Sequence, residues 1–527
     1  MERSARRAVV FVCATLALVC LGVGGAGAAA VKVCPSGCAF SQIAPAIASA
    51  SPGDTIQVAA GTYDGGFTID TSVKLLGAGA GLTIIKGGGP VISIGVAGAV
   101  SEPTVTIDGV TVSGGVTLGN LSPNTARGGG IYIPRAAGPS TGATVTIRNS
   151  VIRDNRVAPS GAVDSVASAG GGGISNDGTL TVDHTLVTGN LVDPASGLTS
   201  EADGGGILDR AFGNLTLRDS VVTDNHAEVT PPNGQGVDSG GILHNGPLLT
   251  IDGSLISNNS AKLTSVLPNS AGPIAGTGGV HIHGDDNCAS PDEGCGVATI
   301  RGSAITGNSV AVSNSVGDAV AAGGGIGDDG VLTLSDSLVS NNHVTASVPA
   351  GSAACACADS AGIGTGGIET INDTHITDNT VVATAPDGTA TAMGGGGSVG
   401  NGLNISITDS LISGNHITAT TTTGTATAIG AGFGNGAALE LRGTTISDNT
   451  GTASGPTGTA QGGGIWNGAF GNGPLGQLTL IDSAIIRNTL SGSPGITVQG
   501  AALFTTNPVT VKDTVIANNV PDQCFGC

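Results

Sequence analysis

The sequence repeats one pattern of apolar and polar positions eleven times between residues 147 and 519. Each copy ends in an asparagine, preceded at three residues by Ile or Val, at five by Ser or Thr, and at eight by Ile, Leu or Val. Four fixed positions in eleven copies predict a solenoid in which each repeat forms one coil. The asparagines are Asn155, Asn190, Asn225, Asn259, Asn308, Asn342, Asn379, Asn415, Asn449, Asn488 and Asn519.

Three short strands are predicted in each coil. The apolar positions eight and ten residues before the asparagine alternate with polar ones, as in a strand with one buried face. The Ser/Thr and Ile/Val positions form a second strand, and a Gly-Gly-aliphatic segment forms a third. Stacked coils would bury an aliphatic column and place identical asparagines about 4.8 Å apart, where their amides can hydrogen-bond as a structural ladder. The aliphatic residues are Ile131, Ile174, Ile207, Ile242, Val280, Ile326, Ile368, Val399 and Ile465, with Phe433 and Leu503 in degenerate copies.

The pattern predicts an all-β, right-handed parallel β-helix with a short N-terminal capping helix, from the helical spacing in residues 41–50. Alternating Ala and Thr after several asparagines, as in residues 418–428, are interpreted as β-arms or long loops leaving the coil. We divide the chain into a signal peptide (1–30), an N-terminal cap (31–60), the first β-helix coils (61–125), the eleven-repeat β-helix (126–520) and a C-terminal disulfide tail (521–527).

The first 30 residues have the pattern of a secretory signal peptide, because Arg3, Arg6 and Arg7 precede an apolar run and three small residues. Without them the chain keeps 15 basic and 37 acidic residues, a net charge of −22. Such a surface repels phosphate backbones, so no nucleic-acid partner is expected. No membrane span is expected after signal removal, and we predict a secreted protein, extracellular or on the cell surface. The composition favours a bacterial source.

Eight cysteines follow the signal peptide as four local pairs, and an even number in a secreted chain predicts disulfides. A zinc site is the rival interpretation, although the pairs are far apart and lack matched histidines. The pairs are Cys34/Cys38, Cys288/Cys295, Cys355/Cys357 and Cys524/Cys527.

Two known groups of proteins resemble parts of this sequence. The stretch from Phe40 to Gly89 resembles the opening of pectin-lyase-like right-handed β-helix proteins, many of which act on acidic polysaccharides. The Gly-Gly-aliphatic and x-x-Asn segments are similar to the repeats of polymorphic outer-membrane-protein adhesins, although those usually have Phe where this chain has Ile or Val. No C-terminal autotransporter barrel is recognised, so membrane anchoring is not implied. Both resemblances imply the fold rather than a function.

Candidate catalytic residues are few. Asp285 and Asp286 lie in a Gly-Asp-Asp sequence that resembles the catalytic pair of polygalacturonases, but the Asn-Thr-Asp, Gly-His-Gly and Arg-Ile-Lys segments of that family are missing. A polar turn before a disulfide loop explains the two aspartates equally. His281 and His283 share one face of a strand and are the candidate metal ligands. Asp328-Asp329 stands without partners in the sequence, and so does Arg135.

A second possible ladder consists of aspartates that stand six residues before six of the repeat asparagines. Stacked carboxylates repel one another, and calcium could relieve that repulsion. Alternatively, an aspartate before Ser or Thr caps a bend through its own side chain. The sequence therefore predicts no cofactor, with calcium as the candidate ion. The residues are Asp219, Asp336, Asp373, Asp409, Asp482 and Asp513.

Scarce aromatic residues, 2% of the chain, argue against a long sugar-binding groove. We therefore predict a secreted structural or adhesion-type β-helix surface protein without catalytic activity, whose partner is a cell-surface or extracellular polysaccharide or protein. The alternative is a polysaccharide lyase or glycoside hydrolase of the pectin-lyase-like type with a diverged site. A third hypothesis has the Thr-rich arms bind ice or crystalline glycan. An enzyme requires a groove with clustered ionisable residues, whereas a structural protein requires a smooth wall of Asn, Thr and Ala.

Overall fold

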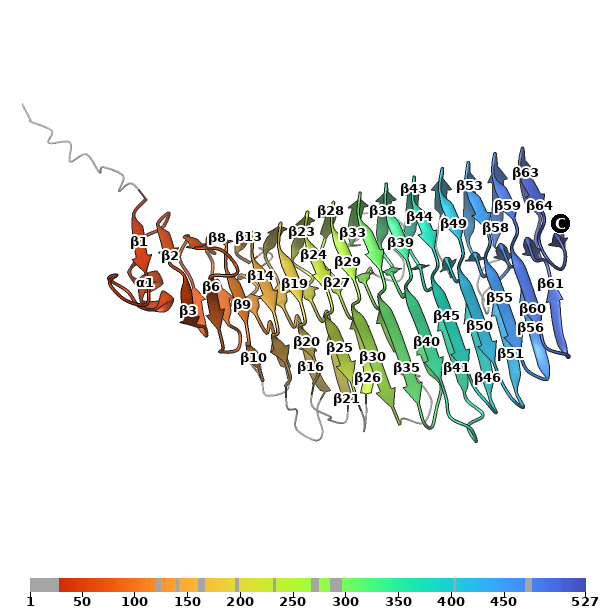
Figure 1. Ribbon diagram of the computed structural model, residues 1–527, viewed down its shortest axis with the longest axis horizontal. Helices are drawn as coiled ribbons and strands as arrows, with labels where there is room; N and C mark the ends of the chain where they lie inside the picture. The colour runs from red at the N-terminus through yellow and green to blue at the C-terminus, as the bar shows by residue number, and fades with distance from the viewer. Residues whose placement is uncertain are drawn as a thin grey trace, which may run out of the picture.

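Five parallel sheets form an elongated β-helix, three of them over its whole length and two from β10 (Val116–Thr117) and β11 (Thr125–Arg127) onward (Figure 1). The computed structural model describes residues 28–119, 125–138, 142–159, 166–194, 199–230, 234–266, 274–284, 296–400, 404–469 and 476–527. Each strand pairs in parallel with the equivalent strand of the next coil, as the predicted solenoid requires. Sheet A has 15 strands, from β1 (Ala30–Val33) to β63 (Val509–Lys512). Sheets B and C have 14 strands each, from β3 (Gly61–Asp64) to β64 (Val515–Ala517) in sheet B and from β4 (Phe67–Ile69) to β65 (Cys524–Phe525) in sheet C. Sheets D and E have 11 strands each, from β10 (Val116–Thr117) to β60 (Thr489–Gly492) in sheet D and from β11 (Thr125–Arg127) to β61 (Ile496–Gln499) in sheet E.

Sheets A, B and C enclose the first core, a continuous column of Ile, Leu and Val. One coil illustrates the pattern, with β18 (Thr179–Asp183) in sheet A, β19 (Leu186–Thr188) in B and β22 (Ile207–Asp209) in C. Their inward residues are fully buried, while polar residues alternate with them. These three strands are the ones that the sequence predicts.

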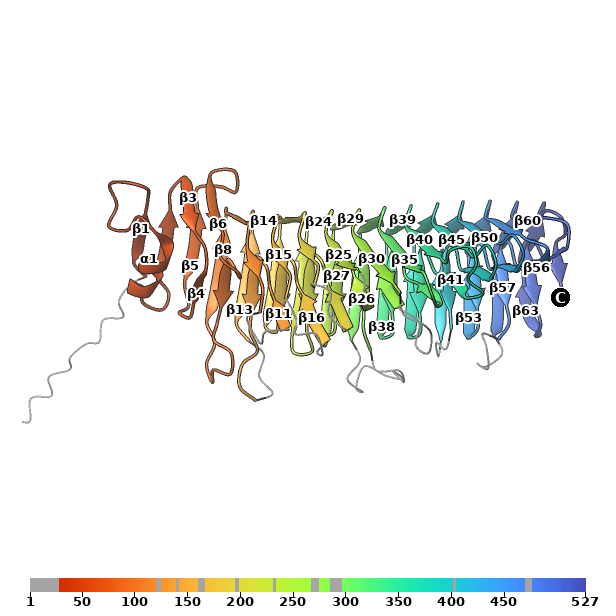
Figure 2. The ribbon, with the colours of Figure 1, turned by 90° about the horizontal axis from the view of Figure 1, so that it is seen from below.

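Sheets D and E form a second layered structure on one side of the solenoid (Figures 1 and 2). In the same coil, β20 (Leu191–Val192) belongs to sheet D and β21 (Thr199–Asp203) to sheet E. Their facing sides pack as a core of Val, Leu and Ala that is separate from the first. The Ala–Thr segments after the asparagines are therefore paired strands with a buried alanine face, and each such coil has five strands.

Register in sheet C corrects two positions of the third predicted strand. The first residues of the sheet C strands stack on one another from coil to coil. Ile363 belongs to this stack because it pairs with Ile326, and Gly397 belongs to it because it pairs with Phe433. Ile368 instead begins β43 (Ile368–Asn372) of sheet A, and Val399 is the third residue of its strand. Ile368 was misassigned because Gly366-Gly367 precedes it, whereas Ala361-Gly362 precedes Ile363, and Val399 was misassigned because the stack position before it is Gly397 rather than an aliphatic residue.

The repeat asparagines are buried where sheet B leads into sheet D. Asn342 shows the contacts: its backbone N–H and its Nδ2 both donate to Oδ1 of Asn379 in the next coil, each at 3.0 Å. Nδ2 also donates to the Ile305 carbonyl of the preceding coil, again at 3.0 Å. Each amide thereby ties three successive coils together. Gln523 accepts from Asn519 at 2.8 Å and ends the ladder.

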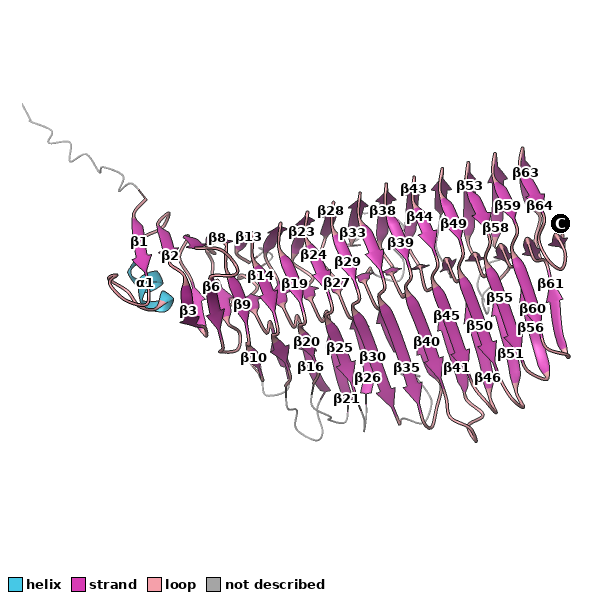
Figure 3. Cartoon of the chain, in the orientation of Figure 1, coloured by secondary structure: helices cyan, strands magenta, loops and turns pink. Residues whose placement is uncertain are grey.

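The N-terminal end carries the helix of the described chain, α1 (Ile43–Ser49), shown in cyan in Figure 3. Ile43, Ala46 and Ile47 are buried and join the first core against β1 and β2 (Thr55–Val58). Residues 1–27, most of the predicted signal peptide, lie outside the described residues. Within the described part of the chain, no helix is both long and apolar enough to span a membrane.

Three of the predicted cysteine pairs form disulfides, Cys34–Cys38, Cys355–Cys357 and Cys524–Cys527. The middle pair lies on β41 (Cys355–Asp359) of sheet E, where alternate residues share one face. Cys288 and Cys295 lie outside the described residues.

Candidate active site between sheets C and E

Sheet E lies beside the outer face of sheet C, and the seam between them runs along the solenoid. Near the C-terminal end Ile429 of sheet E packs there against Trp466 and Phe504 of sheet C. In the middle of the seam, Gly276, Ala322, Gly327 and Gly364 occupy the positions where other coils place larger side chains. A cleft of about 600 Å³ results.

Carboxyl groups and a histidine converge on this cleft. It is lined by His281 of β32 (Val280–Ile282), Asp328 of β37 (Ile326–Asp328), Asp329 and Asp359. Hydroxyl groups of Thr277, Ser360, Thr365 and Ser398 supply much of the remaining wall, and no Lys or Arg is among its described lining residues. The cleft is therefore polar and acidic.

Asp359 ends β41 on the sheet E side of the cleft. Its Oδ1 accepts hydrogen bonds from the hydroxyls of Ser360 and Ser398, both at 2.8 Å. Burial nevertheless raises the pKa of Asp359, because these hydrogen bonds only partly offset the cost of desolvating its charge. This carboxyl group is thus disposed to hold a proton.

His281 and Asp329 form an ion pair on the sheet C side, with Nε2 and Oδ2 3.7 Å apart. Burial lowers the pKa of His281, but Asp329 and Asp238 outweigh it and the net shift is upward. The interaction with His281 lowers the pKa of Asp329 despite burial. Asp329 is therefore the readily ionised carboxyl group of the cleft.

Asp328 and Glu369 lie on the core side of this wall, only 2% and 1% exposed. Burial raises the pKa of Glu369 to about 7, although the interaction with Thr365 opposes the shift. Burial, followed by the charge of Glu369, raises the pKa of Asp328 well above its usual value. No hydrogen-bond partner of normal geometry among the described residues reaches Asp328 Oδ2 or either carboxyl oxygen of Glu369.

The sequence candidates fall into different places. His281 and His283 lie beside the cleft, with ring centroids 5.9 Å apart. Asp285 and Asp286 lie outside the described residues. Arg135 stacks over the Phe212 ring, with its guanidinium carbon 3.5 Å from the centroid.

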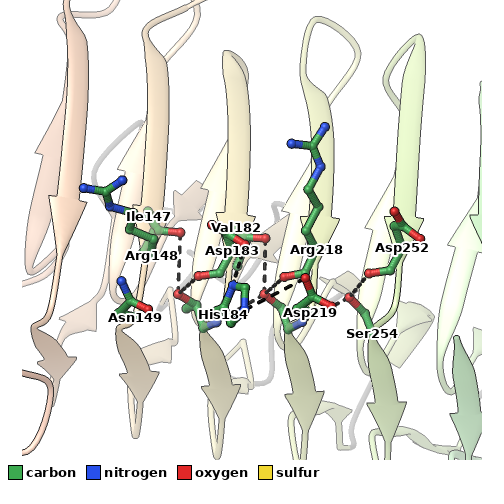
Figure 4. A network of polar contacts seen from close by, with 12 residues as sticks. Ile147, Arg148, Asn149, Val182, Asp183, His184, Arg218, Asp219, Asp252 and Ser254 are labelled. Atoms are coloured by element: carbon green, nitrogen blue, oxygen red, sulfur yellow. Dashed lines mark hydrogen bonds and ion pairs between the residues drawn. The ribbon is translucent and has the colours of Figure 1, made fainter. Parts of the chain in front are cut away.

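The aspartate ladder lies elsewhere, at the bend between sheets A and B (Figure 4). Asp219, Asp336 and Asp373 line a groove there, and all the ladder aspartates have φ between 45° and 50°. Asn149 and His184 adopt the same left-handed conformation in their coils. Asp, Asn, His and Gly tolerate this conformation best, so the bend itself explains the choice of residue.

Hydroxyl groups make the hydrogen bonds to the backbone of the bend. Thr185 Oγ1 donates to the Asp183 carbonyl at 2.9 Å, and Ser220 Oγ to the Arg218 carbonyl at 2.7 Å (Figure 4). The backbone N–H of Thr185 in turn donates to Ser220 Oγ at 3.2 Å. The capping role that the sequence suggests for the aspartates is thus filled by the Ser or Thr that follows them.

Asp359 and Glu369 are absent from the sequence candidates. Glu369 carried a readable signal, because it is the single charged residue at the position ten before the repeat asparagine, where ten copies have Ala, Val, Ile or Leu. The sequence carries no such signal for Asp359, because its place in the cleft depends on residues from neighbouring coils.

A further buried cluster consists of Asn176, Asp209 and His244, all fully buried. His244 Nδ1 lies 2.7 Å from Asp209 Oδ2, and Asn176 Nδ2 donates to Asp209 Oδ1 at 2.5 Å. Burial raises the pKa of Asp209, opposed by His244. Because no solvent reaches these groups, they serve the interior rather than a substrate.

No family model and no curated protein matches this sequence. Among solved structures, the chain is similar to the A-module of the mannuronan C-5 epimerase AlgE6 from Azotobacter vinelandii, at 15% identity and a TM-score of 0.38, covering 92% of this chain and 96% of that one. It is also similar to the catalytic domain of a GH87 α-1,3-glucanase in complex with tetrasaccharides, at 12% identity and a TM-score of 0.24, covering 87% and 64% of the two chains. Neither likeness assigns a role to a residue of this chain.

Proposed function

We propose that the protein is a glycoside hydrolase acting on a neutral polysaccharide in the cleft between sheets C and E. The observation that carries the proposal is the convergence of Asp329, Asp359 and His281 on a cleft that small residues open in the seam. Hydrolysis of a glycosidic bond requires a protonated carboxyl group as acid and a basic group near it. The cleft contains both kinds of group.

Asp359 is the proposed general acid. Its raised pKa keeps a proton available, and the Ser360 and Ser398 hydroxyls hold the carboxyl group in place. The opposite wall, with His281 and Asp329, is the side from which a water molecule or the carboxylate itself attacks the sugar.

The lining of the cleft selects the substrate class. The hydroxyl and carboxyl groups that line the cleft can hydrogen-bond to a polyhydroxylated molecule. An acidic wall without Lys or Arg among its described residues repels uronates, so a neutral chain suits the cleft better. Of the two enzyme classes that the sequence left open, we therefore propose the hydrolase rather than the lyase.

The test is release of reducing ends from a panel of neutral glucans, mannans, xylans and galactans. We expect release from at least one, and the Asp359→Asn variant should lose about 100-fold or more of the rate. Asp336→Asn, an exposed change at the distant bend, is the matched control and should keep full activity. Release that is insensitive to Asp359→Asn, products with an unsaturated sugar, or no release from any member contradicts the proposal.

The structural or adhesion-type role predicted from the sequence stays a prediction. The buried asparagine ladder supports a durable scaffold, but a scaffold does not require a cleft lined with desolvated carboxyl groups.

A further inference from the structure

We propose that His281, His283 and Asp329 form a binding site for a divalent transition-metal ion such as zinc, at the rim of the cleft. One ligand atom of each residue lies within 4.8 Å of the others. The proposal deepens the proposed function, since it concerns the basic side of the same cleft.

The fold brings these three side chains together for a simple reason. Ile282 of β32 points into the first core and is fully buried, so its neighbours His281 and His283 both project from the outer face. Ile282 pairs with Asp328 in the next coil, which places Asp329 opposite His283. Gly327 pairs with His281 and leaves space there.

The distances suit a metal of this class. Two ligand atoms that are each about 2.0–2.2 Å from a tetrahedral zinc ion lie about 3.3 Å apart. His281 Nε2 and Asp329 Oδ2 are 3.7 Å apart, and the two imidazole rings are nearly perpendicular at 87°. The separations from His283 also lie within 4.8 Å, so binding an ion requires the ligand atoms to move closer by side-chain rotation.

The donor set of this site does not suit calcium. Two imidazole nitrogens and one carboxylate favour zinc and its neighbours, whereas calcium takes oxygen ligands. Three protein ligands leave a fourth position for water, as in catalytic rather than structural zinc sites. His281 and Asp329 line the cleft, so an ion bound there would lower the pKa of a water molecule that acts as the nucleophile of the proposed hydrolysis.

A second cluster provides a matched comparison. Asp183, His184 and Asp219 also bring three ligand atoms within 4.8 Å, at the bend between sheets A and B. His184 and Asp219 are exposed, and His184 already pairs with Asp183 at 2.8 Å. This cluster lines no part of the cleft and serves as the control.

The test is zinc binding to the full chain, measured by calorimetry and by metal content after dialysis, without any substrate. We expect one zinc per chain, with affinity reduced at least about 10- to 100-fold in His283→Gln and in Asp329→Asn. His283 is exposed, so its substitution leaves folding intact, which circular dichroism checks. His184→Gln should bind as the unmodified chain does.

Cobalt(II) reports the geometry, because a four-coordinate site gives strong visible absorption that His283→Gln should abolish. Absence of stoichiometric zinc, or loss of binding in His184→Gln instead, overturns the metal site. Asp359→Asn separates the two proposals: it should bind zinc normally while losing hydrolysis. Zinc-independent hydrolysis would leave the proposed function standing and overturn the role of the ion in it.

Discussion

A left-handed residue directly precedes every repeat asparagine. Asp, Asn or Gly occupies this position in ten coils, with φ between 54° and 68°. Arg487 is the exception, and its guanidinium forms two 2.8 Å contacts with Asp448 of the preceding coil. The asparagine that follows can then turn its amide inward and join the ladder. Backbone conformation and hydrogen bonding together account for the invariant end of each repeat.

Glu369 departs from the repeat pattern, because it is a charged residue at a position where the other copies have an aliphatic one. Its neighbours in sheet A are Leu332 and Ile405, which fill the same place in the core. Removing a carboxyl group from water without a partner costs several kcal/mol if it is charged, so the group keeps its proton.

We predict that Glu369 makes the fold less stable as pH rises. Its pKa is about 7 in the folded chain and 4.5 ordinarily, so between these values the folded state holds a proton that the unfolded chain releases. The stabilisation is complete below about pH 4.5 and lost above about pH 7. The shift corresponds to about 3 kcal/mol. Urea unfolding at pH 5 and pH 8 should show this decline.

The Glu369→Leu variant restores the residue type of the other coils and should remove most of that dependence. At pH 8 it should be more stable than the unmodified chain by up to about 3 kcal/mol. Glu440→Leu, on a polar outer position of sheet A, is the control and should leave the pH dependence as it was. An equal decline in all three proteins would show that Glu369 is ionised in the folded state.

At the scale of elements, sheets D and E are a second solenoid layer rather than loops. The inner face of sheet E is almost entirely alanine, and residues of sheet D pack directly against it. Small side chains let two sheets approach closely, and they leave no room for larger ones.

Ala392 tests this packing. It is fully buried on β46 (Thr389–Met393), whereas Thr391 beside it projects from the other face. We predict that Ala392→Leu lowers the free energy of unfolding by about 1–3 kcal/mol through overpacking. Thr391→Leu should change it by less than about 0.5 kcal/mol. Chemical denaturation measures the free energy of unfolding of both variants. Equal effects would mean that sheets D and E do not enclose a packed interior.

Sequence reasoning predicted the elements whose signal lies in a fixed position of every copy. The asparagine, the Ser or Thr and the aliphatic residues recur because each occupies the same site in successive coils. The Ala–Thr strands were harder, since alternation of two small residues is common to strands and low-complexity segments. The cleft could not be predicted, because His281, Asp329 and Asp359 come from three different coils. Aligning the copies in register would have placed His283 beside Asp329.

Over the whole molecule, each coil contacts chiefly the coil before and the coil after it. Stability in such a chain is a sum of coil and interface contributions, and one complete coil can be removed if register is kept. Gly400 is the last residue in the sequence among those that line the cleft. A coil on its C-terminal side is therefore dispensable for the site.

Deletion of residues 416–449 tests this architecture. Asn415 and Asn449 are 34 residues apart, so the deletion joins Asn415 to Thr450 and lets the ladder continue to Asn488. We predict a folded protein with unchanged β-sheet circular dichroism, cooperative unfolding and unchanged zinc binding at His281 and His283. Deletion of residues 416–432 removes only β50 (His416–Thr420) and β51 (Thr425–Ile429), interrupts sheets D and E at this coil, and should prevent folding. Equal loss of structure in both proteins would mean that the coils cooperate globally instead of through neighbouring contacts.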